Sequence, residues 1–377
     1  MLKNQIGIDR MVLSGFRILS IDEVKVRGHQ NVEYEPCGEA LYRMSNGKGF
    51  RFLKIKDNQC FGTLIAGSRQ IGCCRRDYTR IDLFIQNGPQ GNLQNSSVTA
   101  YKHRFLDVLQ YILYEYGIEI NPQLTKLNTL EINCNIALDE EFYKYHRPLR
   151  LIMCILPKQY RNKLAEYSRI EDNASIKSET FFRGNASIEL KIYDKKEHLR
   201  QKTGISPPDN LMRIEFVLKK SAKIKTVFGS NYLADLTDTK INEFFMKQFS
   251  KVIENRYRRW QIDNEKDLSA RVKMHKDQNP RYWKSNLLNE CADIEQKNKI
   301  PVLLDVSDLY PIIKAQDKNG HYRRELQTFQ NYRSYRETFY QKDSVKVNEI
   351  IEKVHEVYDA FIYGLEPESS PSCLFTA

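Results

Sequence analysis

Residues 187–199 read Ser-Ile-Glu-Leu-Lys-Ile-Tyr-Asp-Lys-Lys-Glu-His-Leu, and after one loop residues 211–219 read Leu-Met-Arg-Ile-Glu-Phe-Val-Leu-Lys. In both stretches apolar side chains alternate with mostly polar ones, which is typical of a strand with one buried face. Tyr193 and Glu215 then lie on the faces opposite the apolar residues. We therefore expect a tyrosine, lysines and a carboxylate to share one solvent-facing side of a sheet.

The rest of the first 230 residues mixes strand and helix patterns. Residues 80–85 and 130–136 alternate as strands do, and apolar residues recur every three or four positions from Phe105 to Tyr116. The spacing of three or four positions predicts a helix that packs on a sheet. Gly117 supplies the left-handed residue that often ends a helix. The predicted fold class is α+β, an antiparallel sheet with packed helices.

The length of the chain predicts more than one domain. Its 377 residues exceed the usual size of a single hydrophobic core, while 41% hydrophobic and 28% charged residues are ordinary values for globular proteins. Beyond about Gly229 the periodic segments are helical. We predict an α+β domain at 1–230, an all-helical domain at 231–364 and a flexible tail at 365–377.

The sequence shows neither a membrane span nor a secretory signal. Its longest uncharged apolar stretch, Leu151 to Pro157, is far shorter than the roughly 20 residues that cross a bilayer. The charged pair Asp9-Arg10 appears before an apolar segment of signal length can develop. Eight cysteines without a Cys-x-x-Cys pair indicate reduced, structural thiols. We expect a cytoplasmic protein without a membrane partner.

The charge balance favours a polyanionic partner. Lysine and arginine number 59 against 48 acidic residues, a formal charge of +11, so nucleic acid is the first candidate. Aromatic rings between cations could stack on unpaired bases or pack helix against helix. The candidate DNA-binding residues are Arg213, Lys219, Lys220, Lys223, Lys225, Arg256, Arg258, Arg259 and Trp260.

Four acidic residues occupy polar faces of predicted strands. Carboxylate oxygens suit Mg²⁺ or Mn²⁺, which neutralise charge when a phosphodiester is attacked. Asp82, Glu131 and Glu215 could each instead be a solvated strand residue or the ion-pair partner of Arg80 or Arg213. The candidate metal ligands are Asp82, Glu131, Glu189 and Glu215.

Tyr193 is the candidate nucleophile. A phenol has a pKa of about 10, so it needs a metal-polarised phosphate or a neighbouring cation. Lys191 and Lys195 lie two residues on either side and would share its face in an extended strand, where either could stabilise the transition state or move a proton. Such chemistry on DNA would leave a 5′-phosphotyrosine and a free 3′-hydroxyl. A tyrosine beside Asp-Lys-Lys is also common as surface decoration, and we expect His103 and His198 to face solvent.

The sequence resembles the filamentous-phage gene II and related plasmid replication initiators, tyrosine endonucleases that start rolling-circle replication. The likeness spans roughly residues 75–230 and rests on order and spacing as much as on identity. It is carried by Glu179 to Ser187, by Ile192-Tyr193-Asp194-Lys195 through Leu199, by Leu211-Met212-Arg213-Ile214-Glu215, by Lys223 through Gly229, by Leu130-Glu131-Ile132, and by Pro89 to Leu93-Gln94.

The resemblance implies a Rep-nuclease-like, RRM-like sheet that nicks one origin strand through Tyr193, followed by a helical DNA-binding domain. It implies Mg²⁺ or Mn²⁺ as cofactor and single-stranded or supercoiled origin DNA as partner, with host helicase and polymerase, in a bacterial host. The chain departs from the family where Asn95-Ser96-Ser97 replaces Gly-His-Asn, and where Glu131 replaces an aspartate. A histidine role in binding metal or DNA is therefore unsupported at Asn95-Ser96-Ser97.

Two other classes of function remain open from the sequence. One is a non-catalytic origin- or RNA-binding protein that uses the same sheet as a platform. The other is a relaxase-like protein from a mobile element. Loss of nicking on removal of the Tyr193 hydroxyl would separate the first of these from a nicking enzyme.

Overall fold

The computed structural model of the chain describes residues 6–35, 50–71, 74–84, 96–160, 165–171, 175–204, 206–298, 300–317, 320–339 and 342–364. The segment Pro89 to Asn95 and the predicted tail at 365–377 lie outside these residues.

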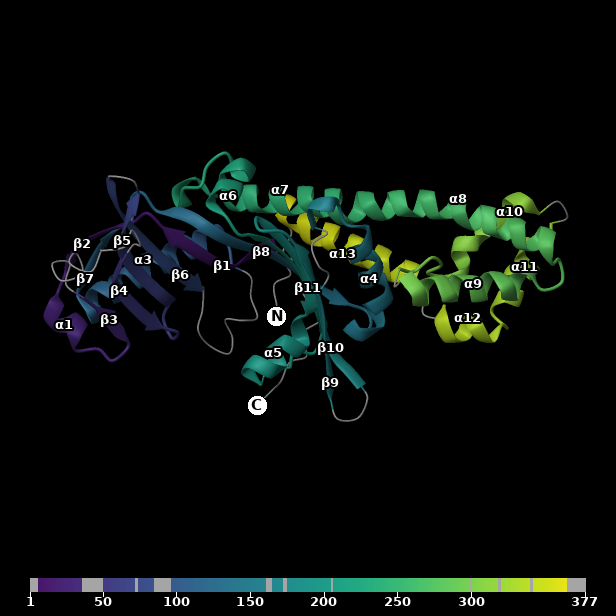
Figure 1. Cartoon of the computed structure of the whole chain (residues 1–377), viewed down its shortest axis with the longest axis horizontal. Helices are drawn as coiled ribbons and strands as arrows, with labels where there is room; N and C mark the ends of the chain where they lie inside the picture. The colour runs from purple at the N-terminus through teal and green to yellow at the C-terminus, as the bar shows by residue number, and fades with distance from the viewer. Residues whose placement is uncertain are drawn as a thin grey trace.

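One large antiparallel sheet dominates the described part of the chain (Figure 1), and it confirms the predicted α+β class. Its ten strands have the order β3-β4-β5-β6-β1-β8-β12-β11-β10-β9. Their bounds are β1 (Ile6–Ser14), β3 (Val32–Tyr34), β4 (Phe50–Asp57), β5 (Gly62–Ile71), β6 (Cys74–Phe84), β8 (Lys126–Leu138), β9 (Ala165–Glu171), β10 (Ser175–Gly184), β11 (Ile188–Asp194) and β12 (Asn210–Leu218). A small second sheet pairs β2 (Arg17–Ile21) with β7 (Ile118–Asn121).

The strands predicted from the 187–199 and 211–219 stretches are adjacent. In the register of β11 and β12, Tyr193 lies opposite Arg213 and Lys191 lies opposite Glu215. On the other side of β12, Arg213 faces Asn135 of β8. Neighbouring residues across strands lie about 5 Å apart, so these polar side chains form continuous rows.

Helices cover the apolar side of the central strands. Phe216 of β12 packs edge to face on Phe245 of α7, with ring centroids 5.4 Å apart. The predicted helix before Gly117 is confirmed as α3, which Ser97 caps by accepting a hydrogen bond from Ala100 N at 3.0 Å. The helices in this region are α1 (Glu23–Arg27), α3 (Val98–Tyr116), α4 (His146–Ile155), α5 (Lys195–Thr203), α6 (Ser221–Phe228), α7 (Asp238–Phe249) and α13 (Asp343–Ile362).

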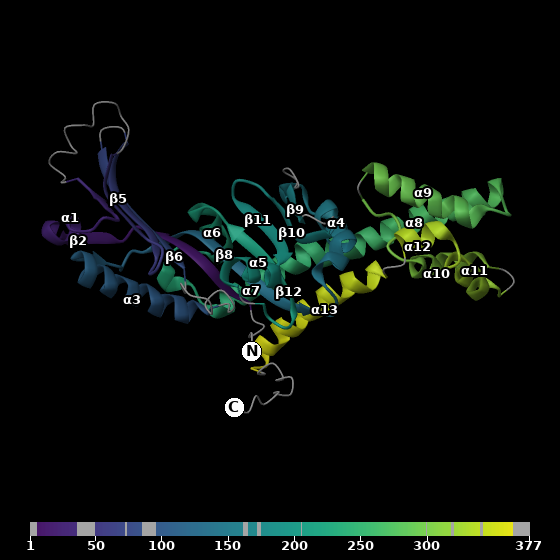
Figure 2. The same ribbon diagram turned by 90° about the horizontal axis from the view of Figure 1, so that it is seen from below.

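The remaining helices form a second hydrophobic cluster at the end of the long helix α8 (Figures 1 and 2). They are α8 (Asn255–Gln278), α9 (Trp283–Asn298), α10 (Tyr310–Gln316), α11 (Tyr322–Phe329) and α12 (Arg333–Thr338). Short helical turns are η1 (Phe142–Tyr145), η2 (Lys158–Tyr160), η3 (Leu233–Asp235), η4 (Ser250–Glu254) and η5 (Val306–Leu309). Buried residues of α7 and α13 belong to the cluster of the large sheet. The domain division at residue 230 stays a prediction.

Arg147 of α4 links the sheet region to the helical one. Its guanidinium donates two hydrogen bonds of 2.7 Å to Glu295 of α9 and pairs with Asp343 at the start of α13. A bidentate pair fixes the relative orientation of its two partners as well as their distance. Within the described ranges, no helix combines the length and the apolar character that a membrane crossing requires.

Candidate active site

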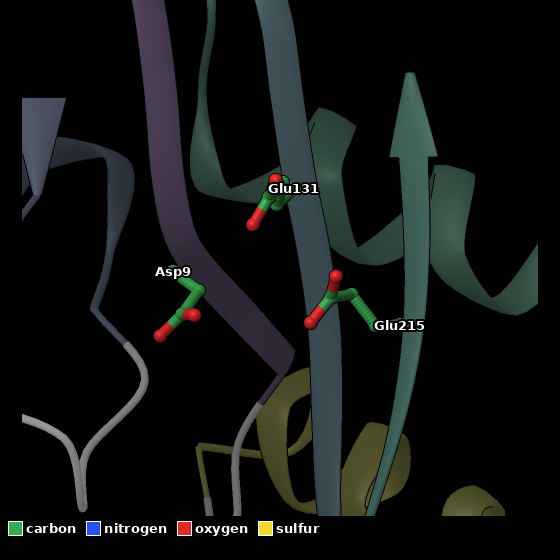
Figure 3. Close-up of side chains that lie close together, drawn as sticks. All are labelled: Asp9, Glu131 and Glu215. Atoms are coloured by element: carbon green, nitrogen blue, oxygen red, sulfur yellow. The ribbon is translucent and has the colours of Figure 1, made fainter. Parts of the chain in front are cut away.

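Three carboxylates from neighbouring strands meet on the polar side of the sheet (Figure 3). Asp9 of β1, Glu131 of β8 and Glu215 of β12 have ligand oxygens that all lie within 4.8 Å of one another. Oxygen donors of this kind are those that Mg²⁺ and Mn²⁺ prefer. This acidic triad can therefore hold a metal ion.

A β-bulge brings Asp9 into the triad. Ile8 pairs with Ile132 of β8 and Arg10 pairs with Glu131, so Asp9 is an extra residue without a partner in this register. A bulge bends the strand and re-aims the side chain of the extra residue. The sequence carried a signal for it, because apolar residues at 6 and 8 are followed by apolar residues at 11 and 13, a shift of one position. We did not predict Asp9 as a ligand.

The electrostatics of the triad favour a bound cation. Burial and the negative charge of Glu215 raise the pKa of Glu131 to about 7. Burial acts to raise the pKa of Asp9 as well, but Arg213 and Lys195 outweigh it and hold that pKa below its ordinary value. Like charges held this close repel one another unless a proton or a cation compensates them. The donor set and its charge thus fit a divalent metal.

Tyr193 lies beside the triad. Its hydroxyl donates to Glu215 Oε2 at 3.4 Å, the long limit of a hydrogen bond. The ring is half-buried, and its centroid lies 5.4 Å from that of His198. Burial raises the pKa of Tyr193 well above its ordinary value, although Arg213 acts in the opposite direction. The phenol is protonated at neutral pH and points at the carboxylates.

The hairpin that carries Tyr193 has a tight turn before it. A Cβ at Gly184 would lie 2.5 Å from the backbone oxygen of Ile188, so only glycine fits there. The Asn185 side chain accepts hydrogen bonds from Ser187 N at 2.7 Å and Ile188 N at 3.0 Å. This turn fixes the register of β10 and β11, and with it the face on which Tyr193 lies.

Arg213 was predicted to bind DNA, and this prediction is wrong. Its side chain is 0% exposed, so it cannot reach a phosphate of bound DNA. Its guanidinium pairs with Asp9 at 3.0 Å and donates to Asn135 Oδ1 at 2.7 Å. A buried arginine must be paired, and here the pairing places a fixed positive charge beside Tyr193 and the triad.

Of the two candidate lysines, Lys191 lies on the expected strand face and Lys195 does not. Lys191 is on β11 and contacts Glu215 Oε1 at 2.7 Å and Glu189 at 3.9 Å. Lys195 does not share the strand face, because β11 ends at Asp194, whose side chain caps α5 by accepting from Glu197 N at 2.9 Å. Lys195 is nevertheless buried.

The pKa values of these lysines differ in direction. Burial and the nearby Arg213 lower the pKa of Lys195 to about 7. Burial alone would lower that of Lys191, but Glu215 and Glu131 raise it. Lys191 is therefore a fixed cation, whereas Lys195 exists in both protonation states near neutral pH.

Other predicted residues lie around this centre. Asp82 pairs with Arg10 at 3.3 Å and with Arg80 at 3.2 Å. Glu189 pairs with Lys219 and with Lys191. The structure brings neither carboxylate into the triad. His198, which we expected in solvent, is half-buried, and burial lowers its pKa to about 4.

The remaining candidate DNA-binding residues vary in exposure. The exposed ones are Lys219, Lys220, Lys225, Arg258 and Arg259, and the half-buried ones are Lys223, Arg256 and Trp260. Trp260 stacks on Tyr257 with ring centroids 5.9 Å apart and packs against the main hydrophobic cluster. Its ring therefore has a packing role, while the exposed cations are accessible to phosphates.

Comparison with known proteins adds little. No family model matches the chain, and no curated protein matches it significantly. A similar solved structure is that of a rolling circle replication initiator protein from Geobacillus stearothermophilus. The identity is 12% and the TM-score 0.28, over 58% of this chain and 76% of the other. A likeness this low establishes neither fold nor function.

Proposed function

We propose that the chain is a metal-dependent, tyrosine-type DNA endonuclease that nicks one strand at a phage or plasmid origin and so starts rolling-circle replication. The observation that carries the proposal is the Tyr193 hydroxyl beside Glu215, a member of the acidic triad. The motif resemblance to gene II and plasmid initiators, with Tyr193 at the position of the nucleophile, supports the same function.

The triad supplies the cofactor site. Asp9, Glu131 and Glu215 would hold Mg²⁺ or Mn²⁺, which would neutralise the charge of the scissile phosphate. We propose no ligand role for Asp82 or Glu189, because neither belongs to the cluster in which the oxygens of Asp9, Glu131 and Glu215 lie within 4.8 Å of one another. Glu131 in place of the aspartate of the initiators keeps an oxygen donor with a longer reach.

Different side chains of the chain have different roles in the proposed nicking step. The Tyr193 oxygen forms a bond to phosphorus as the bond from phosphorus to the 3′ oxygen breaks, which leaves a 5′-phosphotyrosine and a 3′-hydroxyl. Lys195, with a pKa of about 7, is suited to take the phenolic proton or to return one to the 3′ oxygen. Lys191 and Arg213 provide positive charge for the developing dianion.

We assign different roles to the two regions of the chain. Residues 1–230 would carry the catalytic centre, and residues 231–364 would hold origin DNA, single-stranded or supercoiled. The exposed cations Lys220, Arg258 and Arg259 support a phosphate contact that is independent of sequence. The free 3′ end would prime synthesis by the host polymerase, while the host helicase separates the strands.

Removing one oxygen atom tests the proposal. We would incubate the wild-type protein, Tyr193→Phe and the control Tyr114→Phe, a tyrosine 79% exposed on α3, with Mg²⁺ and a supercoiled plasmid that carries the origin of its replicon. Tyr193→Phe should lose nicking and keep DNA binding, while the control nicks normally. Equal nicking by all three proteins would exclude Tyr193. Binding without nicking by all three would indicate the non-catalytic alternative.

A further inference from the structure

A concave site lies in the helical region. A cavity of about 790 Å³ opens between η5, α10, α11, α12 and the start of α13. Figures 1 and 2 show α10, α11 and α12 at the end of α8 remote from β11 and the large sheet. α8 has 24 residues, which corresponds to a length of about 36 Å. The cavity is therefore separate from the residues proposed for catalysis.

The lining of this cavity combines aromatic, amide and cationic side chains. Its polar and aromatic members include Tyr310, Arg323, Gln327, Gln330, Tyr335 and Lys342. Tyr310 is 38% exposed, and its ring is held edge to face against another ring, that of Tyr322, at 5.4 Å. A supported but accessible ring of this kind offers a surface on which a flat ligand can stack.

The charge of the cavity is positive. Arg323 and Lys342 are exposed, and neither forms an ion pair with any residue in the described part of the chain. The acidic residue among the described lining, Asp305, accepts a hydrogen bond from Ser307 N at 2.8 Å and so caps η5. An anion can bind the two cations without first breaking an existing ion pair.

The basic surface continues beyond the cavity. Lys314, Arg324 and Arg336 are exposed on the same three helices, and the Lys314 ammonium lies 5.8 Å from the centroid of the Tyr310 ring. A free nucleotide would need only the cavity itself. A stacking ring with a cation next to it and further exposed cations on the same helices instead suits a polymer with regularly spaced phosphates.

We propose that this cavity binds one unpaired nucleotide of a DNA strand, with its base against Tyr310 and its phosphates near Arg323 and Lys342. A stacking ring beside backbone-binding cations is the combination by which proteins hold single strands without sequence preference. The volume also falls within the range of about 300–1,000 Å³ of small-ligand sites. This inference rests on the proposed function, because it specifies which DNA the helical region holds.

Fluorescence anisotropy with a labelled oligothymidylate tests the cavity in the full-length chain. Without divalent metal, binding is measured independently of nicking. Tyr310→Leu should weaken binding by at least about fivefold at every salt concentration, because one base loses its stacking partner. Arg323→Gln should instead reduce the slope of log affinity against log salt by about 0.7, the value for one phosphate contact on a single strand. The control Lys266→Gln, an exposed charge removed from α8, should change neither quantity.

Lys342 offers a variant that does not threaten folding. It has a φ of 50°, the left-handed region that glycine tolerates and a lysine side chain does not favour. Lys342→Gly should therefore lower the salt slope by about 0.7 without lowering the melting temperature. A weaker complex with an unchanged melting temperature cannot be explained by unfolding.

The results also separate this inference from the proposed function. Wild-type affinity and salt slope in Tyr310→Leu, Arg323→Gln and Lys342→Gly would overturn it, whatever the outcome at Tyr193. Displacement of the oligonucleotide by excess thymidine monophosphate would also overturn it, in favour of a free-nucleotide site. Nicking by Tyr193→Phe would overturn the proposed function and leave the cavity result unaffected.

Discussion

Asp9 and Arg213 join the two strands that flank β8, with Arg213 Nη1 3.0 Å from Asp9 Oδ1. This pair couples the acidic triad to the buried guanidinium next to Tyr193. Loss of either partner would leave the other without its counter-charge, and the free-energy penalty is largest for Arg213, because it has no access to water. The pair therefore links the stability of the central strands to the chemistry proposed for them.

Asp9→Asn should reduce nicking by at least about tenfold, because an amide is a poorer ligand for a divalent metal than a carboxylate. Asp82→Asn is the matched control, since Asp82 lies on the neighbouring strand β6 and pairs with Arg10 and Arg80 outside the triad. Nicking rates at saturating Mg²⁺ measure the difference. Equal losses in the two variants would contradict the assignment of Asp9.

Mg²⁺ should stabilise the protein through the triad. At a metal concentration about ten times the dissociation constant, binding to the folded state contributes about 1.4 kcal/mol to the free energy of unfolding. Glu131→Gln should abolish this metal-dependent rise in melting temperature and, because it removes like-charge repulsion, should not destabilise the metal-free protein. The same rise in wild type and Glu131→Gln would place the ion elsewhere.

Lys195→Met should slow the nicking step by about a hundredfold or more, the usual contribution of a positioned acid or base. Lys195→Arg should be similarly slow, since arginine keeps the charge but does not release its proton near neutral pH. Single-turnover rates with prebound DNA isolate this step. Full activity in the arginine variant would show that Lys195 provides charge and no proton transfer.

Asp308 should make stability depend on pH. Burial raises its pKa from an ordinary 3.8 to about 6, so the folded state binds more protons than the unfolded state between these values. Stability should therefore fall as pH rises through this window, by up to roughly 3 kcal/mol, and then level off. In Asp308→Asn, where an amide oxygen can still accept from Leu304 N and Asp305 N, this component should vanish.

The measurement for Asp308 is the difference between the two proteins in urea unfolding. The free energy of unfolding of Asp308→Asn minus that of wild type should increase from about pH 4 to about pH 6 and remain constant above that. A difference that does not change with pH would show that the carboxyl group titrates normally in the folded chain.

Alternation in the sequence was sufficient to predict the central strands. Residues 188–194 and 210–218 have a predominant period of two, so Tyr193, Lys191 and Glu215 could be placed on one face. Partners across the sheet could not be predicted, since pairing depends on contacts between strands far apart in sequence. The pairing of β8 with β1, which brings Glu131 to Asp9, is of this kind.

The sequence reasoning failed at three residues, each for a different reason. Asp9 was missed because a bulge interrupts the alternation of β1, and Lys195 was misplaced because the capping residue Asp194 ends β11 one residue earlier. Arg213 was assigned to DNA because a polar strand face was taken to be open to solvent. Periodicity thus gave the face of the sheet at Arg213 but could not show what covers it, and at Asp9 and Lys195 the regular strand pattern was interrupted or had ended.

The covalent adduct is the most direct test of a tyrosine nucleophile. The wild-type protein would be incubated with Mg²⁺ and a single-stranded oligonucleotide from the nicked origin strand, then digested with trypsin and analysed by mass spectrometry. The account predicts a 5′-phosphorylated DNA fragment attached to the peptide that contains Tyr193. An adduct on any other residue, or nicking that leaves no DNA attached to protein, would contradict it.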